Sequence, residues 1–310
     1  MAKSMRKTLI LAKIQTAAGV DPVPAAAMNA ILCRATTITP MTAEFADRNL
    51  LRPYMGNGGS VAVTKYSQIE IEVELTGSGA AGTAPAYGAL LRACGLAETI
   101  TAATDVQYQP VSNAMELVTI YAYLDGLMHK MVDCRASVSI DISSRAIPFL
   151  KFTVMGVYAP ITDGATPAGA DYSMFMRPLG VNKTNTPTWV LHSYTGPLQS
   201  FAMDLTNKLV WRSLIGIEGA EITDRTPTGT AVLELPTIAA MNWPSLVIGG
   251  DLAPFSIKHG TAAGNIVQVD MPKVQLTDPA YSDQDGIAML TLKLGIQPDQ
   301  GDDELVLTFK

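Results

Sequence analysis

The stretch "IEIEVELTGSGAAGTAPAYGALLRACG", residues 69–95, decides how the rest of the chain is interpreted. Its first seven residues alternate between apolar side chains and glutamates, the pattern of a half-buried antiparallel strand. Gly77, Gly79 and Gly82 follow with the GxGxxG spacing of a dinucleotide-binding turn. A short helix is expected over 85–94. The question is whether these glycines bind a nucleotide or only let the chain turn.

The surroundings of the glycines disagree with a nucleotide site. In a dinucleotide fold the preceding strand is apolar on both faces, and the helix begins within the glycine turn. Here one face of the strand is acidic, and the helix is delayed past Pro85. The residues that follow, "ETITAATDVQYQP" at 98–110, do not resemble a buried parallel strand. We interpret 76–84 as a flexible glycine-rich loop and expect no cofactor.

Period-two alternation dominates the remainder of the chain, which predicts a mainly β protein. The segment "LVTIYAYLDGLMHKMVDCRASVSIDI" (117–142) predicts a long hairpin with Asp125 and Gly126 in its two-residue turn. A second helix is expected over 243–248, where Pro244 stands near the start. Further strands and hairpins are expected at 147–158, at 201–216 with Thr206 and Asn207 at the turn, at 230–236, and at 255–276 through Ala263 and Gly264.

An internal duplication relates the two halves. Shifting the chain by 160 residues places 49–75 over 209–235 without a gap, so that Arg52 meets Arg212 and Glu74 meets Glu234. The expected order of strand, helix, hairpin and strand also repeats. We therefore expect two tandem, structurally similar β-rich domains, each with one short helix. The first covers 1–160 with an N-terminal arm, a linker covers 161–185, and the second covers 186–310.

Composition and spacing argue against several other classes of protein. The chain is 48% hydrophobic and 16% charged, with a formal net charge of −6 and no basic cluster beyond the N-terminus, which disfavours a nucleic-acid binder. Three cysteines without a CxxC pair indicate reduced thiols rather than a disulfide framework. The apolar run at 9–12 is too short for a signal peptide, and no run could span a membrane.

Chemical sites are equally unsupported by the spacing of polar residues. The three histidines, His129, His192 and His259, stand too far apart in sequence for a zinc motif. The segment "SDQDG" at 282–286 lacks the first acid and the final glutamate of a calcium loop, and is expected to be a turn. No nucleophile motif occurs. We expect no catalytic residues and no metal site.

Four segments together resemble a known family. They are "MNAILCRATTITP" (28–40), "GSGAAGTAPAYGALLRACGL" (77–96), "YLDGLMHKMVDCRASVSIDI" (123–142) and "HGTAAGNIVQVDMPKVQL" (259–276). They are similar to the major tail tube protein of long, flexible-tailed, siphovirus-type bacteriophages. The resemblance implies a mainly β fold of two tandem tail-tube-type domains, each with a β-sandwich or β-barrel-like core and one flanking helix. It also implies a structural, non-enzymatic virion protein whose rings stack into a hollow tube. It implies contacts with other copies of the chain, with the tape-measure and tail terminator proteins and with distal tail or baseplate proteins, after assembly in the host cytoplasm.

The resemblance also implies that inward hairpins join into a barrel around a channel for double-stranded DNA. The family's rings are sixfold, so two domains per chain predict a pseudo-sixfold ring of three chains. The acid excess fits a wall that repels phosphates. Candidate channel-lining residues are Glu116, Thr119, Asp133, Ser139, Gln268 and Asp270. Two alternatives remain: six chains per ring with an outer second half, or a soluble β-rich binding module such as an adhesin or carbohydrate-binding protein.

Overall fold

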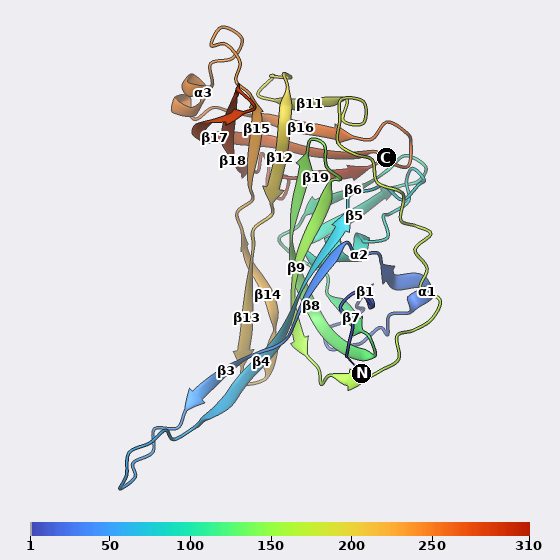
Figure 1. Ribbon diagram of the computed structural model, residues 1–310, viewed down its shortest axis with the longest axis vertical. Coiled ribbons are helices and arrows are strands. Elements are labelled where there is room, and N and C mark those ends of the chain that lie inside the picture. Colours follow the sequence, from blue (N-terminus) through green and yellow to red (C-terminus); the bar gives the residue numbers. More distant parts are fainter. Residues whose placement is uncertain (1) are drawn as a thin grey trace.

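Antiparallel strands make up most of the protein, as the alternating sequence predicts. The computed structural model describes residues 2–310 (Figure 1). In β4 (Ser60–Glu74), the apolar residues Ile69, Ile71 and Val73 are buried while the intervening glutamates are only partly covered. The half-buried antiparallel strand expected at 69–75 is therefore confirmed, and it lies between two other strands.

The first half of the described chain contains ten strands and two short helices. Their bounds are β1 (Thr8–Ile14), α1 (Ala26–Asn29), β2 (Ala30–Ile31), β3 (Ala35–Asp47), β4 (Ser60–Glu74), α2 (Gly88–Ala93), β5 (Leu96–Thr101), β6 (Asp105–Pro110), β7 (Val118–Leu124), β8 (Leu127–Ser143), β9 (Phe149–Tyr158) and β10 (Thr162–Asp163). Hydrogen-bonded pairs order the main sheet as β1–β7–β8–β9–β4–β3, with β2 beside β1.

The second half contains nine strands and one helix among its described residues. Their bounds are β11 (Thr188–Leu191), β12 (Leu198–Asp204), β13 (Asn207–Leu214), β14 (Ile217–Arg225), β15 (Thr228–Glu234), α3 (Trp243–Gly249), β16 (Leu252–His259), β17 (Val267–Gln284), β18 (Ile287–Gln297) and β19 (Val306–Phe309). Its pairs order the sheet as β11–β16–β17–β18–β15–β12. This order repeats that of the first half: β11, β16, β17, β18, β15 and β12 occupy the places of β1, β7, β8, β9, β4 and β3.

The repeat extends to a small accessory strand in each half. β10 pairs with the first residues of β8 on the edge that β9 later occupies. β19 pairs with the first residues of β17 on the edge that β18 later occupies. The halves are joined where β12 pairs with the end of β8 and where β19 pairs with β6. A continuous apolar core runs through both halves, including stacked Phe201 and Phe255.

The two helices expected from the sequence are present. α2 lies within the expected range 85–94 and buries Leu90 and Leu91, while α3 covers the range expected near Pro244. Asn242 caps α3 by accepting a hydrogen bond from the Ser245 amide at 3.1 Å. The one-turn helix α1 begins after Ala25, whose side chain cannot cap it, and the sequence does not predict this helix.

Turn chemistry confirms two hairpins and corrects a third. Asp125 and Gly126 both have positive φ, as a type I′ turn between β7 and β8 requires. β16 and β17 form the expected second hairpin. The hairpin expected at 201–216 is wrong: β12 pairs with β15 and β13 pairs with β14, so the chain only bends near Thr206. Together these four strands form one long bent hairpin, which corresponds to β3 and β4.

The glycines at 77–82 contact backbone of the second half. The Gly79 amide donates to the Gly264 carbonyl at 2.9 Å, and a Cβ on Gly264 would lie 2.4 Å from Gly79 backbone atoms. The Gly77 amide donates to the Asn265 side chain at 3.0 Å, and Ser78 is buried. The expectation of a flexible loop is therefore wrong: the segment is hydrogen-bonded and packed, and its glycines permit a close approach of two backbones.

Candidate assembly interface

The joint between the halves is an antiparallel strand pair between β12 and β8. β7 covers one edge of β8 only as far as Cys134, and β12 continues that edge from Ser139 to Ser143. Met203 of β12 lies opposite Ile140 of β8. Burial of Met203 and Ile140 makes this joint part of the core rather than a surface contact.

One row of side chains shows how completely the joint is filled. It crosses four adjacent strands of the sheet, from β4 through β9 and β8 to β12. Its members are Val73, Leu150, Ile140 and Met203, each opposite the next. All four are at most 2% exposed. Such cross-strand neighbours are the unit of sheet stabilisation, so the joint is as well packed as either half.

The β13–β14 hairpin provides a second contact between the halves, because it lies beside β8 and β9. The Trp211 ring packs against Tyr66 of β4 with centroids 5.2 Å apart, and its Nε1 donates to Thr64 at 2.7 Å. Thr64 in turn donates to Glu218 at 2.7 Å. Figure 1 shows this hairpin descending from the second half toward the strands of the first.

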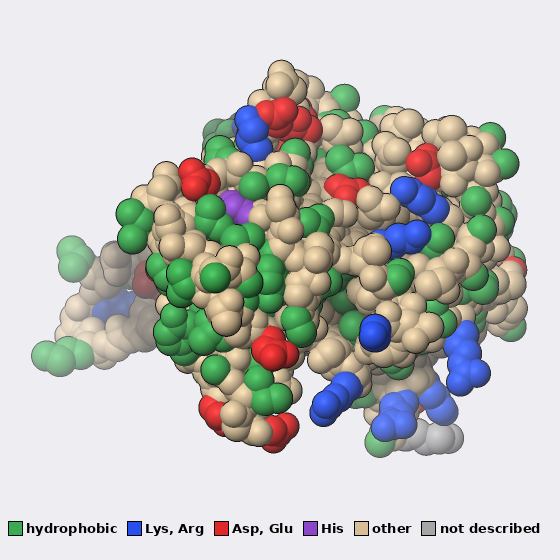
Figure 2. All heavy atoms as spheres, turned by 90° about the horizontal axis from the view of Figure 1, so that it is seen from above, with side chains coloured by type: hydrophobic (Ala, Val, Ile, Leu, Met, Phe, Trp, Pro, Cys, Tyr) green, Lys and Arg blue, Asp and Glu red, His purple; other side chains and the backbone are tan. Residues whose placement is uncertain are grey.

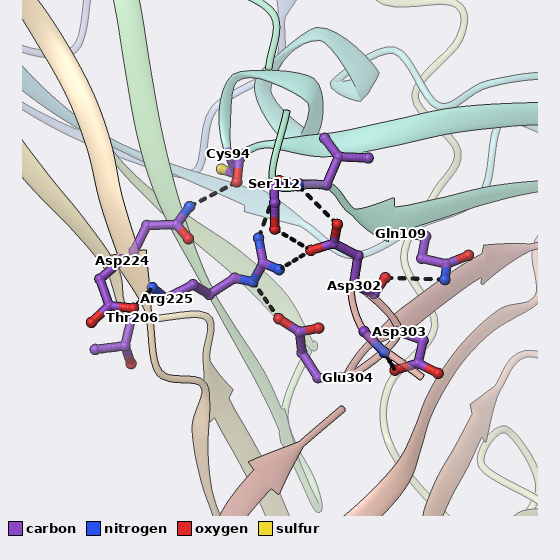
Figure 3. Close-up of polar contacts among 12 residues, drawn as sticks. Cys94, Gln109, Ser112, Thr206, Asp224, Arg225, Asp302, Asp303 and Glu304 are labelled. Atoms are coloured by element: carbon purple, nitrogen blue, oxygen red, sulfur yellow. Dashed lines mark hydrogen bonds and ion pairs between the residues drawn. The ribbon is translucent and has the colours of Figure 1, made fainter. Parts of the chain in front are cut away.

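A buried ion cluster fixes the base of this hairpin (Figure 3). Arg225, the last residue of β14, forms a charge-assisted hydrogen bond with Glu304, and both side chains are at most 10% exposed. Its Nη2 donates to Asp302 at 3.0 Å and its Nη1 to the Val111 carbonyl at 3.3 Å. Arg225 therefore connects the hairpin with the C-terminal segment and with the loop after β6.

Asp302 completes the cluster from the solvent side. It accepts hydrogen bonds from the Ser112 hydroxyl and, at 3.1 Å, from the Ser112 amide. The Ser112 hydroxyl is the main group that lowers the pKa of Asp302, and Arg225 lowers it further. Asp302 is therefore an anion at neutral pH, where it balances the guanidinium.

Two strand edges and one hairpin arm lack such contacts among residues 2–310. β3 pairs only with β4, and β17 has no strand partner beyond Gln275 on the edge that β16 occupies earlier, although α3 lies against β17. In Figure 1 the β3–β4 arm extends far from the rest of the chain. Its exposed apolar side chains are Met41, Phe45, Leu50, Leu51, Tyr54, Met55, Val61 and Val63. An apolar arm and bare strand edges are features of a chain that associates with others.

The candidate channel residues of the first half lie in different environments. Glu116 forms a double hydrogen bond with Arg92. Asp133, at a bulge of β8, accepts from Gln15 and from the Gly19 amide, each at 2.8 Å. Both carboxylates are therefore engaged in holding neighbouring segments.

Thr119 and Ser139 differ in exposure. Thr119 is 0% exposed in the core, so it reaches no surface of the single chain. Ser139 is partly exposed and lines a surface hollow together with Asp141 and Lys151. The hollow lies beside the joint between β8 and β12.

Gln268 and Asp270 lie together on β17, both partly exposed. Asp270 accepts from Ser256 at 2.6 Å and from Gln268 at 2.8 Å, and Gln268 accepts from Lys310 at 3.0 Å. The six candidates therefore form no single cluster within one chain. In the view of Figure 2, most of the visible basic side chains lie on one side of the face, and acidic ones are scattered over the whole of it.

Sequence reasoning missed the Arg225 cluster and the Trp211 contact. Arg225 is 77 residues from Asp302 and 79 from Glu304, so no local spacing relates them. Trp211 did carry a signal, since a tryptophan in a hairpin indicates a packing partner for its ring and a hydrogen-bond acceptor for its N–H. Among residues 2–310 no group of three or more His, Cys, Asp or Glu side chains is arranged to hold a metal ion. No helix in that range is long and apolar enough to cross a membrane.

The fold and its bare edges define a mainly β structural protein. The family of phage tail tube proteins matches residues 5–296, which is nearly the whole chain. The chain belongs to the phage tail tube protein family. Its role is therefore a structural one in the tail of the virion, in association with its own copies and other tail components. No curated protein matches the chain significantly in sequence.

Proposed function

We propose that three copies of the chain close into a pseudo-sixfold ring and that such rings stack into the tail tube. The observation that carries this proposal is the identical strand order of the two halves, together with the β8–β12 joint between them. Each chain supplies two similar modules and one joint. Three chains then supply six modules and three joints, and three joints between chains complete the ring.

The module boundaries that we propose follow the sequence repeat. The first module covers 1–160, a linker covers 161–185, and the second module covers 186–310. The linker region contains one short strand, β10, while the matching strand orders lie on either side of it. The linker allows the second module to take its place beside β8.

The ring surrounds a channel through which double-stranded DNA passes from capsid to host. The net charge of −6 supports a wall that phosphates do not adhere to. We keep the partly exposed Ser139, Gln268 and Asp270 as the leading channel-lining candidates, with Glu116 and Asp133 as secondary ones. We further propose a siphovirus-type tail, a tape-measure protein in the channel before ejection, a tail terminator and distal tail proteins at the ends, and assembly in the host cytoplasm.

Electron microscopy of the purified chain tests the proposal. We expect rings or tubes, and a reconstruction in which each ring contains three whole chains. Six whole chains per ring would refute the pseudo-sixfold arrangement and assign the second half to an outer layer. A stable monomer at high concentration that binds a glycan would instead favour a β-rich binding module.

A further inference from the structure

The strand pair β8–β12 joins the two halves of one chain, but within residues 2–310 the equivalent strands β17 and β3 are not paired with each other. From these unpaired edges we infer the contact between chains. This inference rests on the proposed ring. We propose that β3 of one chain pairs with the distal part of β17 of the next chain, just as β12 pairs with β8 within a chain. The apolar β3–β4 arm then lies on the second half of that neighbour.

The equivalence of strands follows from their pairing partners. β12 and β3 occupy the same terminal place in the two strand orders, beside β15 and β4 respectively. β8 and β17 likewise occupy the same central place. β12 uses its second edge to pair with β8, whereas the second edge of β3 meets no other strand of the described chain. Within residues 2–310, the end of β17 also lacks the strand that β12 provides to β8.

The register of the missing pair follows from the buried row described above. The sequence offset of 160 places Val73 on Leu233, which lies opposite Leu290 of β18. Leu290 lies opposite Tyr281 of β17, which is therefore the counterpart of Ile140. The first two members of this second row are buried, but Tyr281 is 69% exposed. The second row therefore ends at the exposed ring of Tyr281, whereas the first row continues from Ile140 to Met203.

The residue that completes this row is Ile38 of another chain. Met203 lies opposite Gly229. The offset of 160 residues relates Gly229 to Ile69 of the first half, and Ile69 lies opposite Ile38. Ile38 is thus the counterpart of Met203. Placing Ile38 opposite Tyr281 gives an aromatic and β-branched cross-strand pair, one of the favourable combinations in antiparallel sheets.

The arm has a matching seat on the same neighbour. Trp211 corresponds to Leu51, which is fully exposed at the end of the β3–β4 arm. Tyr66, on which Trp211 packs, corresponds to Thr226. A surface hollow beside Arg225 is lined by residues 226–228 and 295–297. In the first half, the corresponding residues are 66–68 and 155–157, which lie beneath the β13–β14 hairpin. The hollow is where an arm from a second copy fits.

Engineered cysteines test the register in the full-length chain. We expect the double variant I38C/Y281C, after assembly and mild oxidation, to give covalently linked chains on a non-reducing gel, with three-chain products as the largest closed species. The natural cysteines interfere little, because burial raises the pKa of all three thiols, that of Cys33 to about 12. The matched control is I38C/S282C, since the side chain at 282 projects from the opposite face of the strand.

A second variant tests the contact without crosslinking. Tyr281 is exposed in the single chain, so Y281D is expected to leave the melting temperature of the unassembled protein unchanged. It places a charge in the row that Ile38 completes, and we expect the concentration required for assembly to rise about tenfold or more. Y281F is the control and is expected to assemble like the unaltered chain.

The outcomes separate this inference from the proposed function. Linked chains in I38C/Y281C together with an assembly defect in Y281D support the β3–β17 contact. Rings that form normally, with no linking in I38C/Y281C or with linking in I38C/S282C instead, overturn the contact or its register while the tube proposal stands. Failure of the unaltered chain to form rings or tubes overturns both.

Discussion

Trp211 of the second half packs on Tyr66 of the first half with ring centroids 5.2 Å apart and an interplanar angle of 30°. This contact holds the β13–β14 hairpin against the strands of the first half, in addition to the continuous pairing of β8 with β12. The hairpin therefore contributes to the stability of the single chain, whereas its counterpart, the β3–β4 arm, extends away from the rest of the molecule (Figure 1).

Replacing Trp211 with alanine tests the contribution of this contact. W211A removes the ring contact with Tyr66 and the hydrogen bond to Thr64, and we expect a loss of about 2 kcal/mol because the side chain is only partly buried. Urea unfolding followed by circular dichroism measures the change. L214A, at an exposed position of the same hairpin, is the control and is expected to change stability by less than about 0.5 kcal/mol.

Replacing Arg225 leaves a buried carboxylate without its partner. R225M is expected to cost about 3–5 kcal/mol because Glu304 remains buried without its cationic partner. The double variant R225M/E304Q removes both charges and is expected to recover more than half of that loss. Comparing the unfolding free energies of the two variants checks the assignment. If the double variant is no more stable than R225M, unpaired Glu304 is not the cause.

The same cluster predicts loss of stability in acid. The pKa of Asp302 is lower in the folded chain than in the unfolded chain, chiefly because of Ser112. Its contribution is therefore present above about pH 4, the ordinary range of an aspartate, and is lost as the pH falls further. Melting temperatures between pH 7 and pH 3 measure this. D302N is expected to be less stable than the natural chain at pH 7, with the difference shrinking toward pH 3.

The close approach of two backbones at Gly264 predicts a position that tolerates no side chain. G264A places a Cβ 2.4 Å from Gly79 backbone atoms and requires an alanine at φ 83°. We expect a loss of at least about 2 kcal/mol, combining left-handed strain with displacement of the 76–84 loop. Gly169 has a similar φ of 75°, and a Cβ added there would meet no atom of the described residues within 4 Å, so G169A isolates the strain alone. Equal melting temperatures for the two variants would show that the close contact is unimportant.

Short-range patterns were sufficient to predict many of the strands and two of the hairpins, but not the strand pairs between distant parts of the chain. The alternation at 69–75 placed Ile69 and Ile71 in the core, and Asp125–Gly126 was recognisable as a hairpin turn because both residues tolerate positive φ. Thr206–Asn207 has similar turn character, yet the chain there only bends. The partners of β12 are β15 and β8, and burial of Phe201 and Met203 between them outweighs the local turn preference.

The glycine spacing shows the same limitation. A Cβ on Gly77 would lie 2.1 Å from the Gly264 carbonyl oxygen, and the Gly79 amide donates a hydrogen bond to the same carbonyl. The local pattern argued against a nucleotide-binding turn, but it could not reveal this contact with a segment far along the chain. The 160-residue repeat, in contrast, is a long-range signal that the sequence does contain. It relates Val73 to Leu233 and so leads to the exposed Tyr281 at the end of the second row.

The charge of the channel wall is testable at Asp270 if that residue faces DNA, as we propose. D270K reverses one charge in each chain and places a cation beside the passing phosphates. DNA ejection from particles built of this variant is therefore expected to slow several-fold, and the effect is expected to be stronger at low salt. D270N keeps the shape and its hydrogen bond with Ser256 and is expected to have a smaller effect in the same direction. The rate of DNA release after triggering, measured with a DNA-binding dye, provides the readout, and D251K at an exposed position beyond α3 is the control. Normal tails whose release rate is unchanged in D270K at every salt concentration would remove Asp270 from the channel wall.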